Sequence, residues 1–156
     1  MLIIGVDYDT RSYHIAFWDG SLLYPVHIAT GESDRELMLS ASRTAELCQK
    51  LNGHMYVEMP IHIQNANTTI KLTKVFAFLY FACLSLNVPF DEIRIQTWKK
   101  ETIGKGNSNK AAVLVFAKAR WGEIIDNQHF ADASCIALAG YQIESRKEDS
   151  NGTSGV

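Results

Sequence analysis

The sequence lacks the features of a secreted, membrane-spanning or disulfide-stabilised protein. No basic segment precedes the first apolar run, so we expect no signal peptide. No apolar run reaches the length of a membrane span, so we expect no membrane partner. Cysteine is scarce and odd in number, and its spacing fits no zinc site. We therefore expect reduced core thiols in a cytoplasmic protein, at Cys48, Cys83 and Cys135.

Internal repeats are also absent, and what remains has the composition of one globular domain. The chain has 156 residues, of which 47% are hydrophobic and 21% charged, which is enough to build a hydrophobic core. The last twelve residues are mostly small, polar or charged. We therefore predict a folded domain over residues 1–144 and a disordered tail over residues 145–156.

The modest net charge of −2 conceals a basic segment. Residues 94–120 carry seven Lys or Arg side chains against one Glu, a net charge of +6, whereas the rest of the chain is acidic. Such a segment indicates a polyanionic partner, although a solvated helix face beside a charged loop would have the same composition. Its glycine-rich loop lacks the spacing of a Walker motif, but its backbone amides could still face a phosphate at a helix start.

Hydrophobic periodicity predicts an α/β fold. Strands are expected at residues 2–7, 12–18, 22–29, 55–58 and 92–95, and helices at 34–51, 68–86, 110–121 and 129–144. The first three strands form an antiparallel meander, since Asp19-Gly20 is a strong hairpin signal. The fourth strand follows a crossover helix and should pair in parallel with the first. The expected architecture is a five-stranded mixed sheet flanked by helices.

Two acidic residues end buried strands of this predicted sheet. Asp7 closes the apolar run 2–7, and Glu58 closes the strand 55–58, which Pro60 terminates. A buried carboxylate is rare unless it is paired or bound to a metal, although Asp7 could also cap the turn that follows. Parallel pairing would place the two carboxylates side by side.

The last helix supplies a third acidic residue, Asp132, with His129 one turn before it on the same face. Divalent ions such as Mg²⁺ prefer carboxylate oxygens, and two such ions can clamp a phosphodiester during hydrolysis. We assign Asp7 to bridge two ions, Glu58 to one, and Asp132 with His129 to the other. His129 alone is equally typical of a helix cap or a surface residue, and Asp126 is the reserve candidate for Asp132.

The motifs resemble the RuvC family of Holliday junction resolvases within the RNase H-like superfamily. The resemblance rests on residues 4–7 (IGVD), 57–58 (VE) and 131–133 (ADA) with the preceding histidine, and on the lysine-rich stretch 99–110 (KKETIGKGNSNK). It implies a homodimer that cuts two opposed strands of a four-way junction with Mg²⁺ or Mn²⁺. By matching position, Lys99 and Lys110 are expected to contact DNA, and Lys100 and Lys105 are further candidates.

The chain departs from this family at two positions. The family has a glycine two residues after the first aspartate, where this sequence has Asp9, and an aromatic residue after the glutamate, where it has Ile61. Whether Asp9 assists in metal binding stays open. These departures suggest a divergent member of viral or phage type, in a bacterium or a virus-infected host cell, that accepts other branched DNA as well.

The helix 68–86 is apolar nearly all round, which is typical of a deeply buried helix or an oligomer interface. Since junction resolution needs two cuts, we expect a homodimer through this helix. The alternatives are an RNase H-like nuclease acting on RNA or other branched DNA, and a non-catalytic module that binds branched DNA. An actin-like or sugar-kinase fold, which also begins with Gly-x-Asp, would need a second phosphate-binding hairpin and a longer chain.

Overall fold

The structure, a computed structural model, describes residues 1–60 and 65–152 and centres on a mixed five-stranded sheet of order β3-β2-β1-β4-β5. Its strands are β1 (Ile3–Tyr8), β2 (Ser12–Trp18), β3 (Leu23–Ala29), β4 (His54–Glu58) and β5 (Phe90–Ile93). The first three form an antiparallel meander, whereas β4 is parallel to both β1 and β5. The predicted α/β architecture is confirmed.

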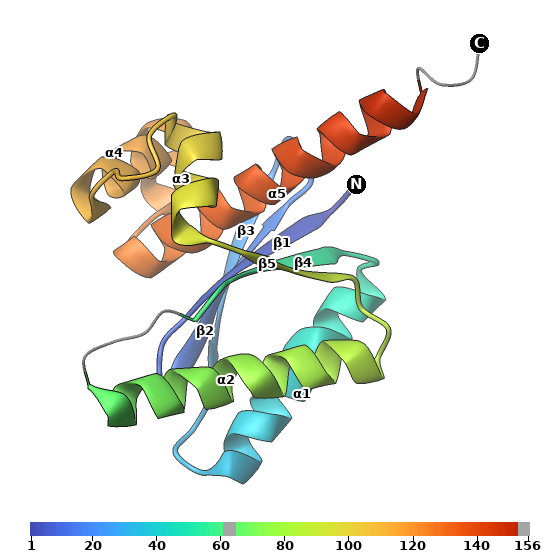
Figure 1. Ribbon diagram of the computed structural model, residues 1–156, viewed down its shortest axis with the longest axis vertical. Coiled ribbons are helices and arrows are strands. Elements are labelled where there is room, and N and C mark those ends of the chain that lie inside the picture. Colours follow the sequence, from blue (N-terminus) through green and yellow to red (C-terminus); the bar gives the residue numbers. More distant parts are fainter. Residues whose placement is uncertain (61–64, 153–156) are drawn as a thin grey trace.

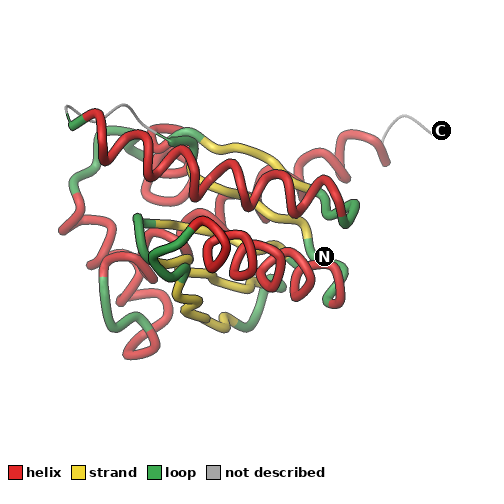
Figure 2. The backbone as a smooth tube through the Cα atoms, turned by 90° about the horizontal axis from the view of Figure 1, so that it is seen from below, coloured by secondary structure: helices red, strands yellow, loops and turns green. Residues whose placement is uncertain are grey.

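Helices cover both faces of the sheet (Figures 1 and 2). One layer holds α1 (Asp34–Lys50) and α2 (Ala66–Ser85), and the other holds α3 (Ile95–Ile103), α4 (Lys110–Trp121) and α5 (Gln128–Gly152). A separate hydrophobic core lies between the sheet and each layer. A capping box begins α1, in which the Ser33 hydroxyl accepts a hydrogen bond from the amide of Glu36. The three cysteines are free and buried, as expected.

Successive side chains of β1 point to opposite faces of the sheet, so they contact different layers of helices. Ile4 and Val6 point into the core formed with α1 and α2. Gly5 faces α5, and a Cβ atom placed on Gly5 would lie 2.2 Å from the carbonyl oxygen of Ala133 and 2.4 Å from the amide nitrogen of Ala137. Glycine therefore lets α5 pack directly on β1, which brings the start of α5 to the end of the central strand.

The local structure differs from the expectations in three places. Helix α3 was not predicted, and β5 begins and ends about two residues before the expected strand 92–95. The tail expected from residue 145 is helical through Gly152, where Arg146 pairs with Glu101 on α3 and Lys147 pairs with Glu144 one turn earlier. Ile61 lies outside the described residues.

Helix α2 corrects the expectation that no segment is long and apolar enough to cross a membrane. By length and composition alone it meets that description, yet little of it is buried within this chain. Its buried side chains, Val75, Leu79 and Cys83, belong to the core beneath the sheet, and it packs beside α1. Ile70, Phe81 and Leu84 remain more than half exposed.

Candidate active site

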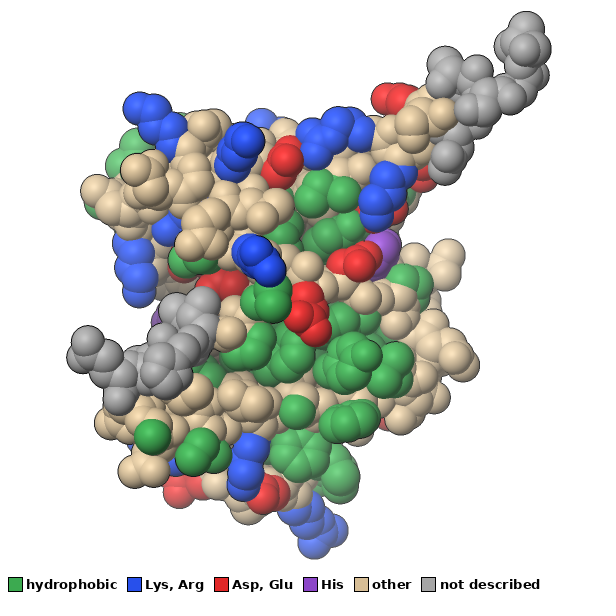
Figure 3. Space-filling view, in the orientation of Figure 1, with side chains coloured by type: hydrophobic (Ala, Val, Ile, Leu, Met, Phe, Trp, Pro, Cys, Tyr) green, Lys and Arg blue, Asp and Glu red, His purple; other side chains and the backbone are tan. Residues whose placement is uncertain are grey.

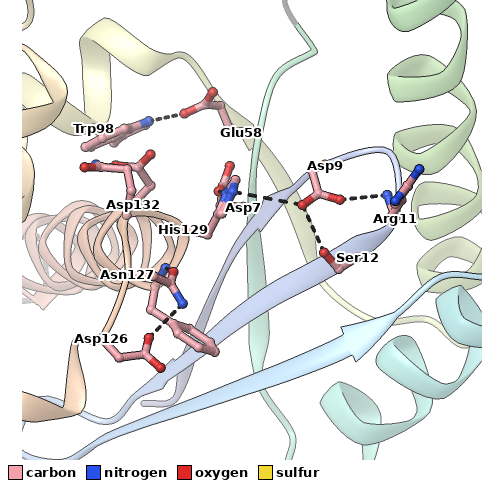
Figure 4. Close-up of polar contacts among 12 residues, drawn as sticks. Asp7, Asp9, Arg11, Ser12, Glu58, Trp98, Asp126, Asn127, His129 and Asp132 are labelled. Atoms are coloured by element: carbon pink, nitrogen blue, oxygen red, sulfur yellow. Dashed lines mark hydrogen bonds and ion pairs between the residues drawn. The ribbon is translucent and has the colours of Figure 1, made fainter.

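The three acidic residues singled out in the sequence converge at one end of the central strands. Asp7 lies near the end of β1, and Glu58 is the last residue of β4. Val6 is opposite Val57 in the parallel register, so the next residues, Asp7 and Glu58, lie side by side. Asp132 comes from the start of α5, and Figure 4 shows the three side chains turned toward a shared space.

His129 contacts the carboxylate on the central strand. Its Nδ1 lies 2.7 Å from Oδ2 of Asp7, and this hydrogen bond raises the pKa of His129 above its ordinary value. The side chain of Asp7 is 13% exposed and that of His129 is 45% exposed. The carboxylate is therefore shielded by the fold, while the imidazole borders solvent.

The surroundings of Glu58 disfavour the charged form of its carboxyl group. Burial raises its pKa to about 7, and the charges of Asp7 and Asp132 act in the same direction. The indole Nε1 of Trp98 donates a 2.7 Å hydrogen bond to Oε2 of Glu58, which opposes the rise. Trp98 lies on α3, is fully buried, and holds Glu58 from the layer of helices that also contains α5.

The surroundings of Asp132 also disfavour the charged form of its carboxyl group. Burial raises its pKa to about 6, and the charge of Asp7 adds to the effect. The side-chain amide of Gln128 donates a 2.8 Å hydrogen bond to Oδ1 of Asp132, and this bond together with the charges of Lys110 and Lys99 lowers the pKa. The basic segment therefore acts electrostatically on the acidic cluster.

The donor set fits a hard divalent cation. Carboxylate oxygens are the ligands that Mg²⁺ and Mn²⁺ prefer, and one imidazole beside them is compatible with Mn²⁺. Carboxylates that raise each other's pKa give up their protons readily when a cation supplies the missing positive charge. Asp7, Glu58, Asp132 and His129 are the residues that would hold such ions.

The raised pKa of Glu58 predicts how the metal-free protein responds to pH. The unfolded chain ionises this carboxyl near pH 4.5, whereas the folded protein retains the proton to about pH 7. The folded state binds more protons in between, so the free energy of unfolding should fall as pH rises through this window, by up to about 3 kcal/mol. Glu58→Gln keeps an acceptor for Trp98 and should unfold with a flatter pH profile and higher stability at pH 8.

Urea titrations of the metal-free proteins from pH 4.5 to 8 measure this difference. Glu123→Gln, at an exposed position on the surface, is the matched control and should follow the parent. A Glu58→Gln profile as steep as that of the parent between pH 5 and 7 would contradict the prediction.

Two other acidic residues lie between helices and strands, outside the cluster of three carboxylates. Asp9 accepts hydrogen bonds from the amide of Arg11 and the hydroxyl of Ser12, and its carboxylate lies 4.0 Å from Nε2 of His129. Asp126, the reserve candidate, is exposed and bonds to the side chain of Asn127 away from the three carboxylates (Figure 4). The structure thus favours Asp132 over Asp126 as a partner of Asp7.

The four candidate lysines differ in exposure. Lys99 is buried, its ammonium donates a 2.7 Å hydrogen bond to the carbonyl of Ser108, and it lies over the ring of Trp98. Lys100, Lys105 and Lys110 are exposed. Lys99 therefore braces the loop between α3 and α4, while the other three are free to meet a polyanion; DNA contact by any of them stays a prediction.

Sequence reasoning missed His14, which lies on β2 opposite Asp7. Its ring stacks on that of His129, with centroids 4.4 Å apart and planes 12° from parallel, and Phe130 packs edge-on against it. Burial and the neighbouring His129 lower the pKa of His14. The one available signal was the hairpin register, because the short turn between the first two strands places residue 14 across from Asp7.

Comparisons with known proteins find similarity to RuvC proteins, although no family model matches the chain. A curated relative, the crossover junction endodeoxyribonuclease RuvC of Brachyspira hyodysenteriae, is 28% identical over 109 residues, which cover 69% of this chain and 68% of the relative. The structure of Thermus thermophilus RuvC matches with a TM-score of 0.78 and 19% identity, over 94% of this chain and 97% of that one. The T. thermophilus RuvC complex with a Holliday junction substrate matches with a TM-score of 0.76 and 20% identity, over 89% and 92%.

The chain therefore has the α/β fold of the T. thermophilus RuvC structure, with the acidic cluster at the end of its central strands. The resemblance to the RuvC family inferred from the motifs is confirmed by the curated relative and by this fold.

Proposed function

We propose that the protein is a crossover junction endodeoxyribonuclease that resolves four-way DNA junctions by paired, metal-dependent hydrolysis of phosphodiester bonds. The observation that carries this proposal is the convergence of Asp7, Glu58 and Asp132 at the end of two parallel strands, beside His129. The similarity to RuvC, including a structure with a Holliday junction substrate, supports the choice of DNA.

The position of each residue indicates its role in metal binding. Asp7, central and shielded, would bridge two metal ions, with Glu58 on one side and Asp132 with His129 on the other. Two Mg²⁺ or Mn²⁺ ions in this site would activate the attacking water and stabilise the leaving oxygen. Trp98 and Gln128 hold Glu58 and Asp132 in place through their hydrogen bonds.

The experiment that tests this function compares three labelled substrates: a four-way junction, a linear duplex of the same sequence and an RNA–DNA hybrid, each with and without Mg²⁺. Symmetric cuts in the junction that need the metal support the proposal. Cleavage of the hybrid or of other branched DNA alone points to a related nuclease, and junction binding without cleavage points to a non-catalytic module. The cytoplasmic location stays a prediction.

The exposed lysines in the loop after α3 and at the start of α4 should bind the phosphate backbone. Changing Lys105 and Lys110 to Ala should weaken junction binding and reduce the slope of log K against log salt by roughly one unit per lost contact. Gel-shift titrations at several salt concentrations measure this slope. Lys50→Ala, at the exposed end of α1, is the control and should leave it unchanged. A parental slope in the double variant would mean that these side chains do not meet DNA.

A homodimer through α2 would supply the two sites that paired cutting requires. Figure 3 shows hydrophobic side chains gathered over the half of the molecule that contains α2. A groove of about 380 Å³ between α1 and α2 is lined in part by Met38, Phe78, Phe81 and Leu86, and Phe81 is 62% exposed. A twofold interface could bury such a self-complementary surface, at roughly 800 Å² per partner.

Light scattering at micromolar concentration should therefore give twice the 17.5 kDa mass of one chain. Phe81→Glu should give the single-chain mass, because it places a charge in the buried interface. Val115→Glu on α4 changes an equally exposed apolar side chain elsewhere and should leave the dimer intact. A single-chain mass for the parent protein would rule out a stable dimer and require assembly on the DNA.

A further inference from the structure

A row of polar side chains continues from the acidic cluster across one face of the sheet. In the registers of the first three strands, His27 is opposite His14 and His14 is opposite Asp7. Side chains opposite each other in neighbouring strands lie on the same face. Asp7 therefore has a carboxylate, Glu58, on one side and an imidazole, His14, on the other.

His14 is unusual because it is buried at the edge of a polar site. Its exposed fraction is 7%, and its Nδ1 is buried with no hydrogen-bond partner among residues 1–60 and 65–152. Buried polar atoms are nearly always paired, so an unpaired one calls for an explanation such as a bound ion. The stacked ring of His129 and the edge of Phe130 hold the imidazole in place.

The same imidazole lies within reach of two other ligand atoms. One oxygen of Asp7 and one ring nitrogen each of His14 and His129 lie within 4.8 Å of one another. Carboxylate oxygen suits both Mg²⁺ and Mn²⁺, whereas imidazole nitrogen is a ligand of transition-metal ions, a class that includes Mn²⁺ and not Mg²⁺. Two imidazoles around one carboxylate thus bias a site toward an ion that accepts nitrogen.

We propose that His14 is a ligand of the metal centre and gives it a preference for Mn²⁺ over Mg²⁺. This inference rests on the proposed function, since it adds a residue to that metal centre. The alternative role is purely steric, in which the ring of His14 supports His129 without touching an ion.

Calorimetric titration of Mn²⁺ and of Mg²⁺ into the metal-free full-length protein separates these roles. His14→Phe keeps a planar ring against His129 but removes both nitrogens. It should lower Mn²⁺ affinity by about tenfold or more and Mg²⁺ affinity much less, so that the ratio of the two affinities falls. His27→Phe, which changes the exposed histidine next in the row, is the matched control and should retain the parental ratio.

A spectroscopic measurement on the unsubstituted protein does not depend on how the variants fold. Electron spin echo modulation of bound Mn²⁺ should report two coupled imidazole nitrogens in the parent. One coupling should persist in His129→Phe and vanish when His14→Phe is added.

A single coupling in the parent, or an unchanged affinity ratio in folded His14→Phe, would overturn the assignment of His14 and leave the metal centre itself standing. Failure of the parent to bind either ion would overturn both this inference and the metal-dependent function.

Discussion

An Asp7→Asn protein should fold like the parent and cleave four-way junctions more slowly by several orders of magnitude. The substitution keeps the volume of the side chain and removes the charge that would bridge two metal ions. The amide can still bond to His129, so α5 should stay in place. Because the charge of Asp7 raises the pKa values of Glu58 and Asp132, both pKa values should also fall in this variant.

Single-turnover cleavage of a labelled junction measures this loss, with circular dichroism and thermal unfolding as checks on the fold. Asp126→Asn is the matched control, since it makes the same chemical change at an exposed residue just before α5 and should cut at the parental rate. Near-parental cleavage by a folded Asp7→Asn protein would remove Asp7 from the proposed mechanism. Loss of activity in Asp126→Asn would instead show that the wrong aspartate had been chosen on α5.

The sequence was sufficient to predict where the carboxylates meet, because strand ends carry strong local signals. A buried apolar run that stops at Asp7, and a second that stops at Glu58 before Pro60, mark the same edge once a crossover helix makes the strands parallel. Asp132 followed from helical spacing relative to His129. These inferences depend on short-range patterns and on one rule of topology.

What escaped prediction depends on contacts between distant residues. The stacking of His14 on His129 joins β2 to α5, and the bond from Trp98 to Glu58 joins α3 to β4. Neither pair leaves a pattern in the sequence around it. Lys99 illustrates the same limit, since its place in a basic segment suggested an exposed side chain, whereas the fold buries it against Trp98.

The second large effect is expected at Gly5, which lets the helix that carries Asp132 and His129 pack directly on the central strand. A Cβ atom there would lie 2.2 Å from the carbonyl oxygen of Ala133 and 2.4 Å from the amide nitrogen of Ala137. Both contacts are to the backbone of α5, so no rotamer change can relieve them, and the helix must move away from β1. Overpacking of this kind costs about 3 kcal/mol or more.

Gly5→Ala should therefore lower the free energy of unfolding by about that amount in urea titrations, and its folded fraction should cleave junctions poorly. The second loss follows because α5 carries Asp132 and His129, so a displaced helix separates them from Asp7 on β1. Adding Ala137→Gly removes a side chain but not the backbone nitrogen that a Cβ atom would meet, and it should not restore stability. Full rescue by that second change would show that the clash is with a side chain of α5. Gly5 would then not set the separation between the helix and the central strand.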